Sequence, residues 1–100
     1  MIKEAKELIN SNNLEDKKLG IILLSTLVSK EEFKEYVRSI QGSPINYKYP
    51  VVFYYDDWDT RIYVGDNRIR IGMANTYSEE KCKERNPGIE IIELYELTRK

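Results

Sequence analysis

Residues 51–73, VVFYYDDWDTRIYVGDNRIRIGM, decide the fold of this 100-residue chain. Apolar and polar side chains alternate along 61–64 and again along 68–73. Residues 51–55 are rich in β-branched and aromatic side chains, which strands favour. A period of two is typical of a strand with one face buried. We therefore predict three strands in this stretch.

The short segment between the second and third of these strands predicts their register. If Asp66 and Asn67 are the two loop residues of a hairpin, the apolar side chains on both strands fall on one face. Tyr63 and Arg70 then lie opposite each other on the other face. The four apolar side chains that share the first face are Ile62, Val64, Ile69 and Ile71.

The part of the chain before this stretch predicts helices. Across residues 1–42, apolar side chains recur every three to four positions between charged ones. Ser29 and Glu32 form a capping box, which indicates that a helix begins after Ser29. Gly42, followed by Pro44, indicates where that helix ends.

A middle helix is predicted between the first helix and the one that Ser29 begins. Asn13 suits its N-cap, and Asp16 lies favourably in its first turn. Its C-terminal half is apolar almost all round, so we expect it to be the most buried helix. Its apolar side chains are Leu19, Ile21, Ile22, Leu23, Leu24 and Leu27.

The C-terminal part of the chain predicts one more helix and one more segment. Thr76 and Glu79 can form a second capping box, which predicts a short helix over 76–85. Residues 89–97 favour a final strand, because the segment opens with β-branched residues. A last helix is the alternative, since Glu, Leu and Lys favour helices.

These elements predict an α+β fold in a single domain, residues 1–100. A three-helix part, 1–42, packs on a sheet part, 50–100, formed by an antiparallel meander of three to four strands with a short helix before the last one. The hydrophobic fraction of 41% and the charged fraction of 33% are those of an ordinary globular chain, which argues against wholesale disorder.

Composition excludes several kinds of chemistry. The chain has no histidine, the commonest general base and imidazole metal ligand. Its single cysteine, Cys82, forms no intrachain disulfide and no thiolate cluster, and without histidine we expect it to be inert. The net charge is −1, so we expect neither nucleic acid nor a membrane as a partner. We expect no enzyme activity and no cofactor, and a cytoplasmic protein without signal peptide or membrane span.

One face of the predicted hairpin is a candidate anion site. Guanidinium groups beside an aromatic ring can hold a phosphate, a nucleotide or another small anion. The structural alternative is that glutamates of residues 89–97 neutralise these arginines, with Tyr63 and Arg70 in a cation–π pair. The candidate ligand-binding residues are Arg61, Tyr63, Arg68 and Arg70.

A surplus of tyrosine suggests a contact surface. The chain has 8 tyrosines and one tryptophan against 2 phenylalanines, and tyrosine and tryptophan are enriched in interface hot spots. An alternating strand cannot bury Tyr54 and Tyr55 on the same face, so one of them faces outward unless another element or a second subunit covers it. The alternative to a contact surface is that residues 43–50 cover this edge of the sheet. The candidate interface residues are Tyr54, Tyr55 and Trp58.

An acidic turn is a weaker candidate for a metal site. Asp56, Asp57 and Asp59 lie within four residues, and clustered carboxylates suit hard cations. The spacing fails the EF-hand pattern, and hairpin turns use Asp for their own backbone hydrogen bonds. We therefore interpret these residues as a solvated turn and predict no metal site.

Residues 8–24, LINSNNLEDKKLGIILL, resemble helical segments in proteins of Bacteroidetes bacteria and their phages. The shared pattern is a short helix, a Ser/Asn-rich break and an apolar helix. The resemblance implies a small accessory protein of the kind a phage encodes, and it assigns no functional residue.

Together these patterns favour a small non-enzymatic interaction protein. We expect it to self-associate, or to bind another protein, through the tyrosine-rich sheet region. The alternative is a protein that binds or sequesters a nucleotide or another small anion on the arginine-lined face of the hairpin.

Overall fold

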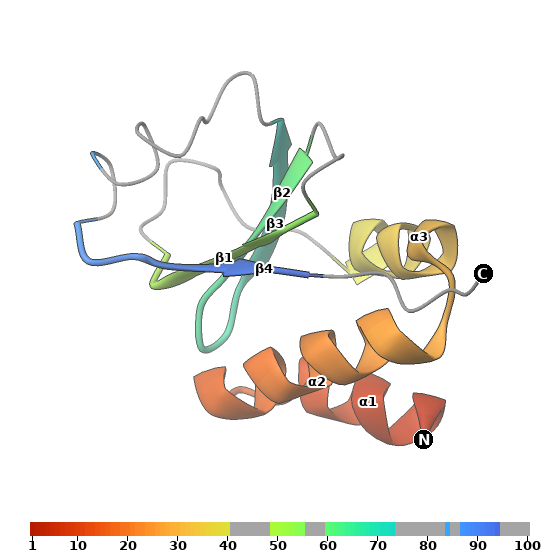
Figure 1. The fold of residues 1–100 in the computed structure, drawn as a ribbon. Coiled ribbons are helices and arrows are strands. Elements are labelled where there is room, and N and C mark those ends of the chain that lie inside the picture. The colour runs from red at the N-terminus through yellow and green to blue at the C-terminus, as the bar shows by residue number, and fades with distance from the viewer. Residues whose placement is uncertain (41–48, 56–59, 74–83, 85–86, 95–100) are drawn as a thin grey trace.

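The computed structural model describes residues 1–40, 49–55, 60–73, 84 and 87–94, and it places three helices before a four-stranded sheet (Figure 1). The chain therefore has an α+β fold, as predicted. The elements are α1 (Ile2–Ile9), α2 (Leu14–Leu27), α3 (Lys30–Ile40), β1 (Val51–Tyr54), β2 (Thr60–Val64), β3 (Ile69–Met73) and β4 (Glu90–Glu93).

The sheet has the strand order β3-β2-β1-β4 and is mixed. The strands β1, β2 and β3 form the predicted antiparallel meander. The prediction of a purely antiparallel sheet is wrong, because β4 pairs with β1 in parallel, with Val52 opposite Ile91. The chain leaves β3 at one edge of the sheet and returns at the opposite edge. The two parallel strands, β1 and β4, are connected by residues 55–89, which exceed the dozen or more residues that a parallel pair needs.

The hairpin between β2 and β3 has the predicted register. The backbone N–H of Gly65 donates to the carbonyl of Arg68 at 2.9 Å, so Asp66 and Asn67 are the two loop residues. Val64 lies opposite Ile69, Ile62 lies opposite Ile71, and Tyr63 lies opposite Arg70. The alternation of side chains was therefore sufficient to fix the pairing of these two strands.

Two of the helices begin at the predicted caps. The side-chain oxygen of Asn13 accepts a hydrogen bond from the backbone N–H of Asp16 at 3.0 Å, at the start of α2. The hydroxyl of Ser29 accepts one from the backbone N–H of Glu32 at 3.1 Å, at the start of α3. Each cap satisfies a backbone donor that has no partner within its helix. The end of α3 that was predicted at Gly42 lies outside the described residues.

A close contact joins α1 to α2, which lie side by side beneath the sheet in Figure 1. A Cβ atom at Gly20 would lie 2.7 Å from the carbonyl oxygen of Ala5 and 2.8 Å from the backbone nitrogen of Ile9. Only glycine lets the two backbones approach so closely without a shift. This contact holds the helices as a pair under one face of the sheet.

The main core lies between the helices and the sheet. Its buried members come from all three helices, from β1, β2 and β3, and from the residues around β1 and β4. They are Ala5, Ile9, Ile21, Leu24, Phe33, Val37, Val51, Phe53, Tyr55, Ile62, Val64, Ile69 and Leu94. The four apolar side chains of the hairpin contribute to this core, with Ile71 only partly buried.

The helix α2 holds five buried residues, against two each in α1 and α3, so it is the most buried helix as expected, but it is not buried all round. Leu19 is 51% exposed, Ile22 40% and Leu27 37%. The helix packs on α1 through Gly20 and on the core through Ile21, which leaves its third side uncovered by the described residues.

The C-terminal elements are described in part. The strand β4 agrees with the preference for a strand within 89–97, and the alternative of a helix fails there. The helix predicted over 76–85 and the end of the segment beyond residue 94 lie outside the described residues. Within the described ranges, no helix has the length and apolar character that a membrane crossing requires.

Candidate functional site

The predicted anion site lies on the face of the sheet that points away from the helices. Because Ile62 and Val64 belong to the helix-side core, Arg61 and Tyr63 must point to the other side of β2. Arg70 lies beside Tyr63 in the neighbouring strand, and Arg68 lies two residues before Arg70. The fold thus brings the four predicted residues to one face, which we call the outer face of the sheet.

The outer face is more buried than the sequence suggested. Tyr63 is 2% exposed and belongs to a second hydrophobic cluster with Tyr49, Val52 and Ile89. The rings of Tyr49 and Tyr63 have centroids 5.7 Å apart. Tyr63 therefore lies on the predicted face but offers almost no surface to a ligand. Alternation assigns a side chain to a face, but it does not tell whether that face is covered.

Arg61 makes a packing contact on the sheet that differs from the glutamate pairs and the Tyr63–Arg70 pair of the structural alternative. Its guanidinium lies over the ring of Tyr54, 4.9 Å from the centroid, within the range of a cation–π interaction. Tyr54 is half-buried, as are Arg68 and Arg70. One of the three predicted anion-binding arginines therefore has a packing role on the sheet itself.

The candidate interface residues are separated from one another. Tyr54 lies on the outer face, whereas Tyr55 is buried in the helix-side core, where its ring meets that of Phe33 edge to face at 6.2 Å. The prediction that only one of the two tyrosines faces the helices is confirmed. Lys30 places its ammonium 5.2 Å from the centroid of the Tyr55 ring. Trp58 lies outside the described residues.

The acidic turn also lies outside the described residues, at Asp56, Asp57 and Asp59. Among the residues that the structure does describe, no three carboxylate or cysteine side chains gather where they could hold a metal ion.

The sequence did not single out the outer side of α2 as a candidate surface. Leu19, Leu23 and Leu27 follow one another at intervals of four, so they form one ridge along the helix, with Ile22 beside it. Leu23 is half-buried, and the other three are the exposed residues described above. The signal was present in the sequence for Leu19 and Ile22, because the buried Gly20, Ile21 and Leu24 of the same helix leave these two positions on the opposite side.

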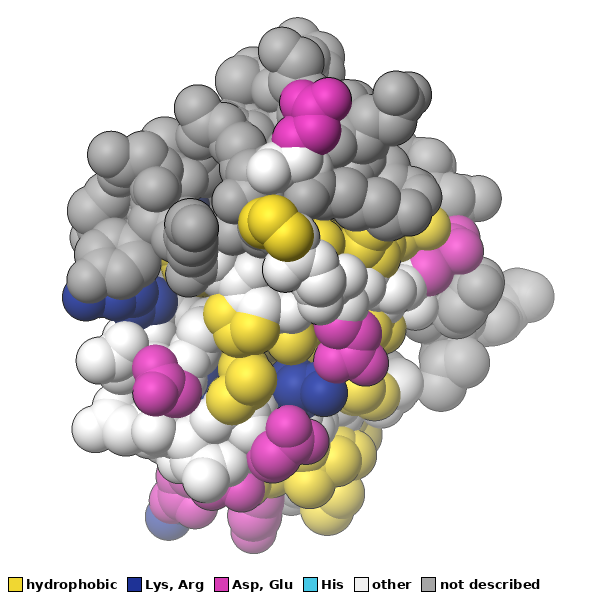
Figure 2. Space-filling view, turned by 90° about the vertical axis from the view of Figure 1, so that its left-hand side faces the viewer, with side chains coloured by type: hydrophobic (Ala, Val, Ile, Leu, Met, Phe, Trp, Pro, Cys, Tyr) yellow, Lys and Arg dark blue, Asp and Glu magenta, His cyan; other side chains and the backbone are white. Residues whose placement is uncertain are grey.

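Acidic side chains surround the N-terminal end of α2, the hairpin tip and the start of β4. Figure 2 shows this side of the molecule, where acidic side chains are interspersed with hydrophobic ones. Lys18 bridges α2 to β4 with an ion pair of 2.8 Å to Glu90, and its ammonium lies 3.8 Å from Glu15. The hydrogen bond to Glu90 is the main reason why the pKa of Lys18 is raised.

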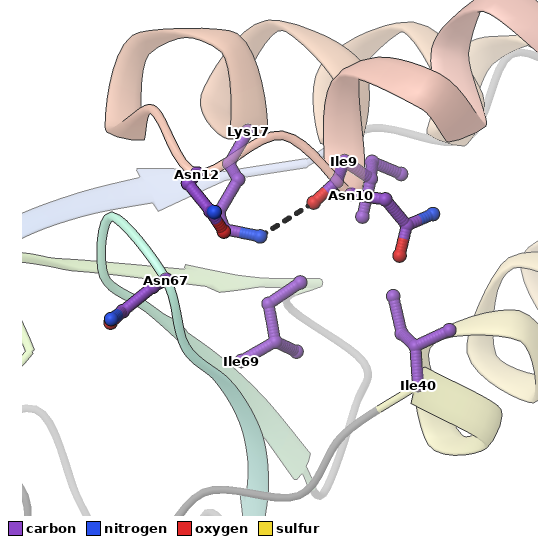
Figure 3. A pocket seen from close by; sticks show the side chains of 7 residues that line it. All are labelled: Ile9, Asn10, Asn12, Lys17, Ile40, Asn67 and Ile69. Carbon is purple, nitrogen blue, oxygen red and sulfur yellow. Dashed lines mark hydrogen bonds between the residues drawn. The ribbon is translucent and has the colours of Figure 1, made fainter.

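A second site, missed by the sequence analysis, surrounds Lys17. Its side chain is only 6% exposed, and its Nζ donates a hydrogen bond to the carbonyl of Ile9 at 2.7 Å. A cavity of about 330 Å³ adjoins it, between the turn joining α1 to α2, the end of α3 and the tip of the β2–β3 hairpin (Figure 3). The lining residues are Ile9, Asn10, Asn12, Lys17, Ile40, Asn67 and Ile69.

Burial changes the acid–base chemistry of this lysine. Loss of hydration lowers the pKa of Lys17, and the negative charge of Asp66 at the hairpin tip acts in the opposite direction. The position was recognisable from spacing. Leu14, Lys17, Ile21 and Leu24 follow one another at intervals of three and four, which places this lysine in the core-facing row of α2.

Comparisons of this chain with models of protein families, with curated proteins and with solved structures gave no match.

Proposed function

We propose that the protein is a non-enzymatic interaction protein that associates with a second copy of itself through the outer side of α2. The observation that carries this proposal is the ridge of Leu19, Leu23 and Leu27 with Ile22 beside it, three of which are more than one third exposed. Single exposed apolar residues are ordinary on protein surfaces. Several exposed apolar side chains along one helix, here Leu19, Ile22 and Leu27, are typical of a contact site.

The shape and charge of the chain support self-association. A helix of 14 residues is about 21 Å long, so two copies of α2 can lie against each other around a two-fold axis and bury the same residues on both. Copies with a net charge of −1 repel each other only weakly. The tyrosine-rich sheet region stays a prediction as a second contact, and Tyr54 and Trp58 are its remaining candidates. The main contact is assigned to α2 and not to the sheet, because Tyr55 and Tyr63 are buried within one chain.

Sedimentation velocity over a range of protein concentrations tests the proposal. We expect the wild-type protein to show a concentration-dependent dimer and Ile22→Lys to sediment as a monomer, because the new ammonium would have to be buried without a partner. The matched control is Ile2→Lys on α1, where the isoleucine is 42% exposed, close to the 40% of Ile22. The control variant should dimerise like the wild type.

Circular dichroism shows whether both variants keep the fold, which we expect because the two isoleucines are exposed. A wild-type protein that stays monomeric at the highest soluble concentration would refute self-association. Equal weakening by Ile2→Lys and Ile22→Lys would refute the assignment to α2.

A second candidate function is anion binding on the outer face of the sheet, which is supported by the shared face of Arg61, Arg68 and Arg70. A thermal-shift series with linear and cyclic nucleotides tests it. A bound nucleotide at 100 times its dissociation constant stabilises the protein by about 2.7 kcal/mol. Binding that survives Arg70→Met would argue against this face.

A further inference from the structure

The cavity beside Lys17 contains a charge that the fold has taken out of water. Among the described residues, Lys17 is the only buried side chain that carries a charge. Burial of an ammonium is unfavourable unless acceptors replace the lost water. The acceptors around Lys17 therefore indicate which hydrogen bonds its ammonium makes within the chain and which it can still make.

One acceptor is present, and it belongs to α1. The carbonyl of Ile9 lies at the C-terminal end of that helix, where carbonyl groups have no partner within the helix and the dipole favours a positive charge. Lys17 thus caps α1. An ammonium has three N–H donors, and the hydrogen bond to Ile9 is the single one that Lys17 makes with the described part of the chain. Two donors remain available to a molecule in the cavity.

The polar part of the lining offers further hydrogen bonds. The side-chain amide of Asn10 donates hydrogen bonds to the carbonyl of Lys6, at 2.8 Å, and to the hydroxyl of Tyr36, at 2.7 Å. The side-chain amides of Asn12 and Asn67 make no hydrogen bond with any other described residue, although both line the cavity. Asn12 lies close to Lys17 in Figure 3, whereas Asn67 lies at the hairpin tip. A ligand can therefore meet an ammonium and an amide donor at the same end of the cavity.

Three isoleucines complete the lining. Ile9, Ile40 and Ile69 come from α1, α3 and β3 (Figure 3). Ile9 is fully buried in the main core and Ile69 is 5% exposed, so the apolar surface that the cavity offers is small. The cavity volume lies at the lower end of the usual range for ligand pockets, which suits a small ligand with few apolar atoms.

The charges nearby restrict the charge of the ligand. The site offers one positive charge, and Asp66 at the hairpin tip already acts on it. A dianion such as a phosphate monoester would be repelled by this carboxylate, whereas a monoanion would be balanced by the ammonium.

From these contacts we infer that the cavity binds a small monocarboxylate. The carboxylate accepts hydrogen bonds from the Lys17 ammonium and the Asn12 amide, and the few apolar atoms of the ligand contact the partly exposed Ile40. This site is independent of the contact on α2, since Lys17 and Ile22 lie on different sides of that helix.

Isoleucine methyl groups make the site directly observable. In a protein labelled at isoleucine methyls, titration with 3-methylbutanoate should shift the NMR signals of Ile9, Ile40 and Ile69. The signal of Ile22, on the outer side of α2, should not move. The neutral amide of the same acid has the same shape without the charge, and we expect it to bind at least about tenfold more weakly because it loses a charge-assisted hydrogen bond.

Two variants test the roles of the charged and polar groups. Lys17→Met removes the ammonium and should weaken 3-methylbutanoate binding at least about tenfold. Its matched control is Lys3→Met, which removes one exposed lysine from α1 and should leave binding unchanged. If Lys17→Met does not fold, Asn12→Asp decides, because Asn12 is exposed and the new carboxylate would repel the ligand.

Three results would overturn the inference. The first is the absence of shifts at the three isoleucines up to about 20 mM ligand, well above a millimolar dissociation constant. The second is binding of inorganic phosphate or of the neutral amide as tightly as the carboxylate. The third is unchanged carboxylate binding in the folded variants Lys17→Met or Asn12→Asp.

Discussion

The two faces of the sheet differ in what covers them, and the difference appears within three consecutive residues of β1. Val51 and Phe53 belong to the large cluster beneath the helices, whereas Val52 belongs to the small cluster on the outer face. All three are at most 2% exposed. A strand with one open face would bury every second residue. The run Val-Val-Phe is instead the pattern of a strand that is buried on both faces.

The largest effect is expected on the helix side. Phe53 is fully buried in the main core, so Phe53→Ala should lower the free energy of unfolding by about 3–5 kcal/mol. Urea denaturation followed by circular dichroism measures it. A loss below about 1 kcal/mol, the range of ordinary surface positions, would mean that the helices do not cover β1.

A substitution on the outer face should cost less stability than one on the helix side, but more than one at an exposed position. Val52→Ala removes two methyl groups at about 0.8 kcal/mol each and leaves a small cavity, so we expect a loss of about 2 kcal/mol. The same denaturation experiment measures it. A change within about 0.5 kcal/mol would show that the outer face is open to solvent and would restore the surface that the sequence suggested.

The local elements of this fold were predictable because their signals are local. Asn13 and Ser29 act within one helical turn, and the hairpin pairing follows from a two-residue loop and strict alternation. The parallel placement of β4 was not predictable in this way. Its partner strand, β1, lies about forty residues earlier in the chain, and no pattern within 89–97 distinguishes one edge of the sheet from the other.

For the candidate site, the sequence predicted only which side chains share a face of the sheet. Alternation correctly placed Arg61, Tyr63 and Arg70 together, but burial of Tyr63 depends on residues from other segments, such as Tyr49 and Ile89. Lys17 was missed for a different reason. It lies among the charged residues Glu15, Asp16 and Lys18, which obscure the spacing that places it toward the core.

The outer face also contains an interaction of intermediate size. Arg61→Met removes the cation from the ring of Tyr54 and keeps much of the apolar stem, so we expect a loss of about 0.5–1 kcal/mol. Arg38→Met is the control, because Arg38 is exposed on α3 and pairs only loosely with Glu35 at 3.8 Å. If the two variants lose equal stability, the contact between Arg61 and Tyr54 contributes nothing of its own.

The smallest effect is expected for the ion pair that joins α2 to β4. Lys18 of α2 reaches Glu90 at 2.8 Å, and Ile92, two residues later, packs against the same helix-side cluster. A double-mutant cycle with Lys18→Met and Glu90→Gln should give a coupling of about 0.2–1 kcal/mol that decreases at high salt. Because the ion pair raises the pKa of Lys18, the coupling should be complete below pH 10.5 and disappear as the pH rises through the raised value. Loss of hydration lowers the pKa of the neighbouring Lys17. The free energy of unfolding should therefore rise as the pH increases from this lowered value to 10.5. No coupling at low salt and neutral pH would show that this ion pair does not help to hold β4 against α2.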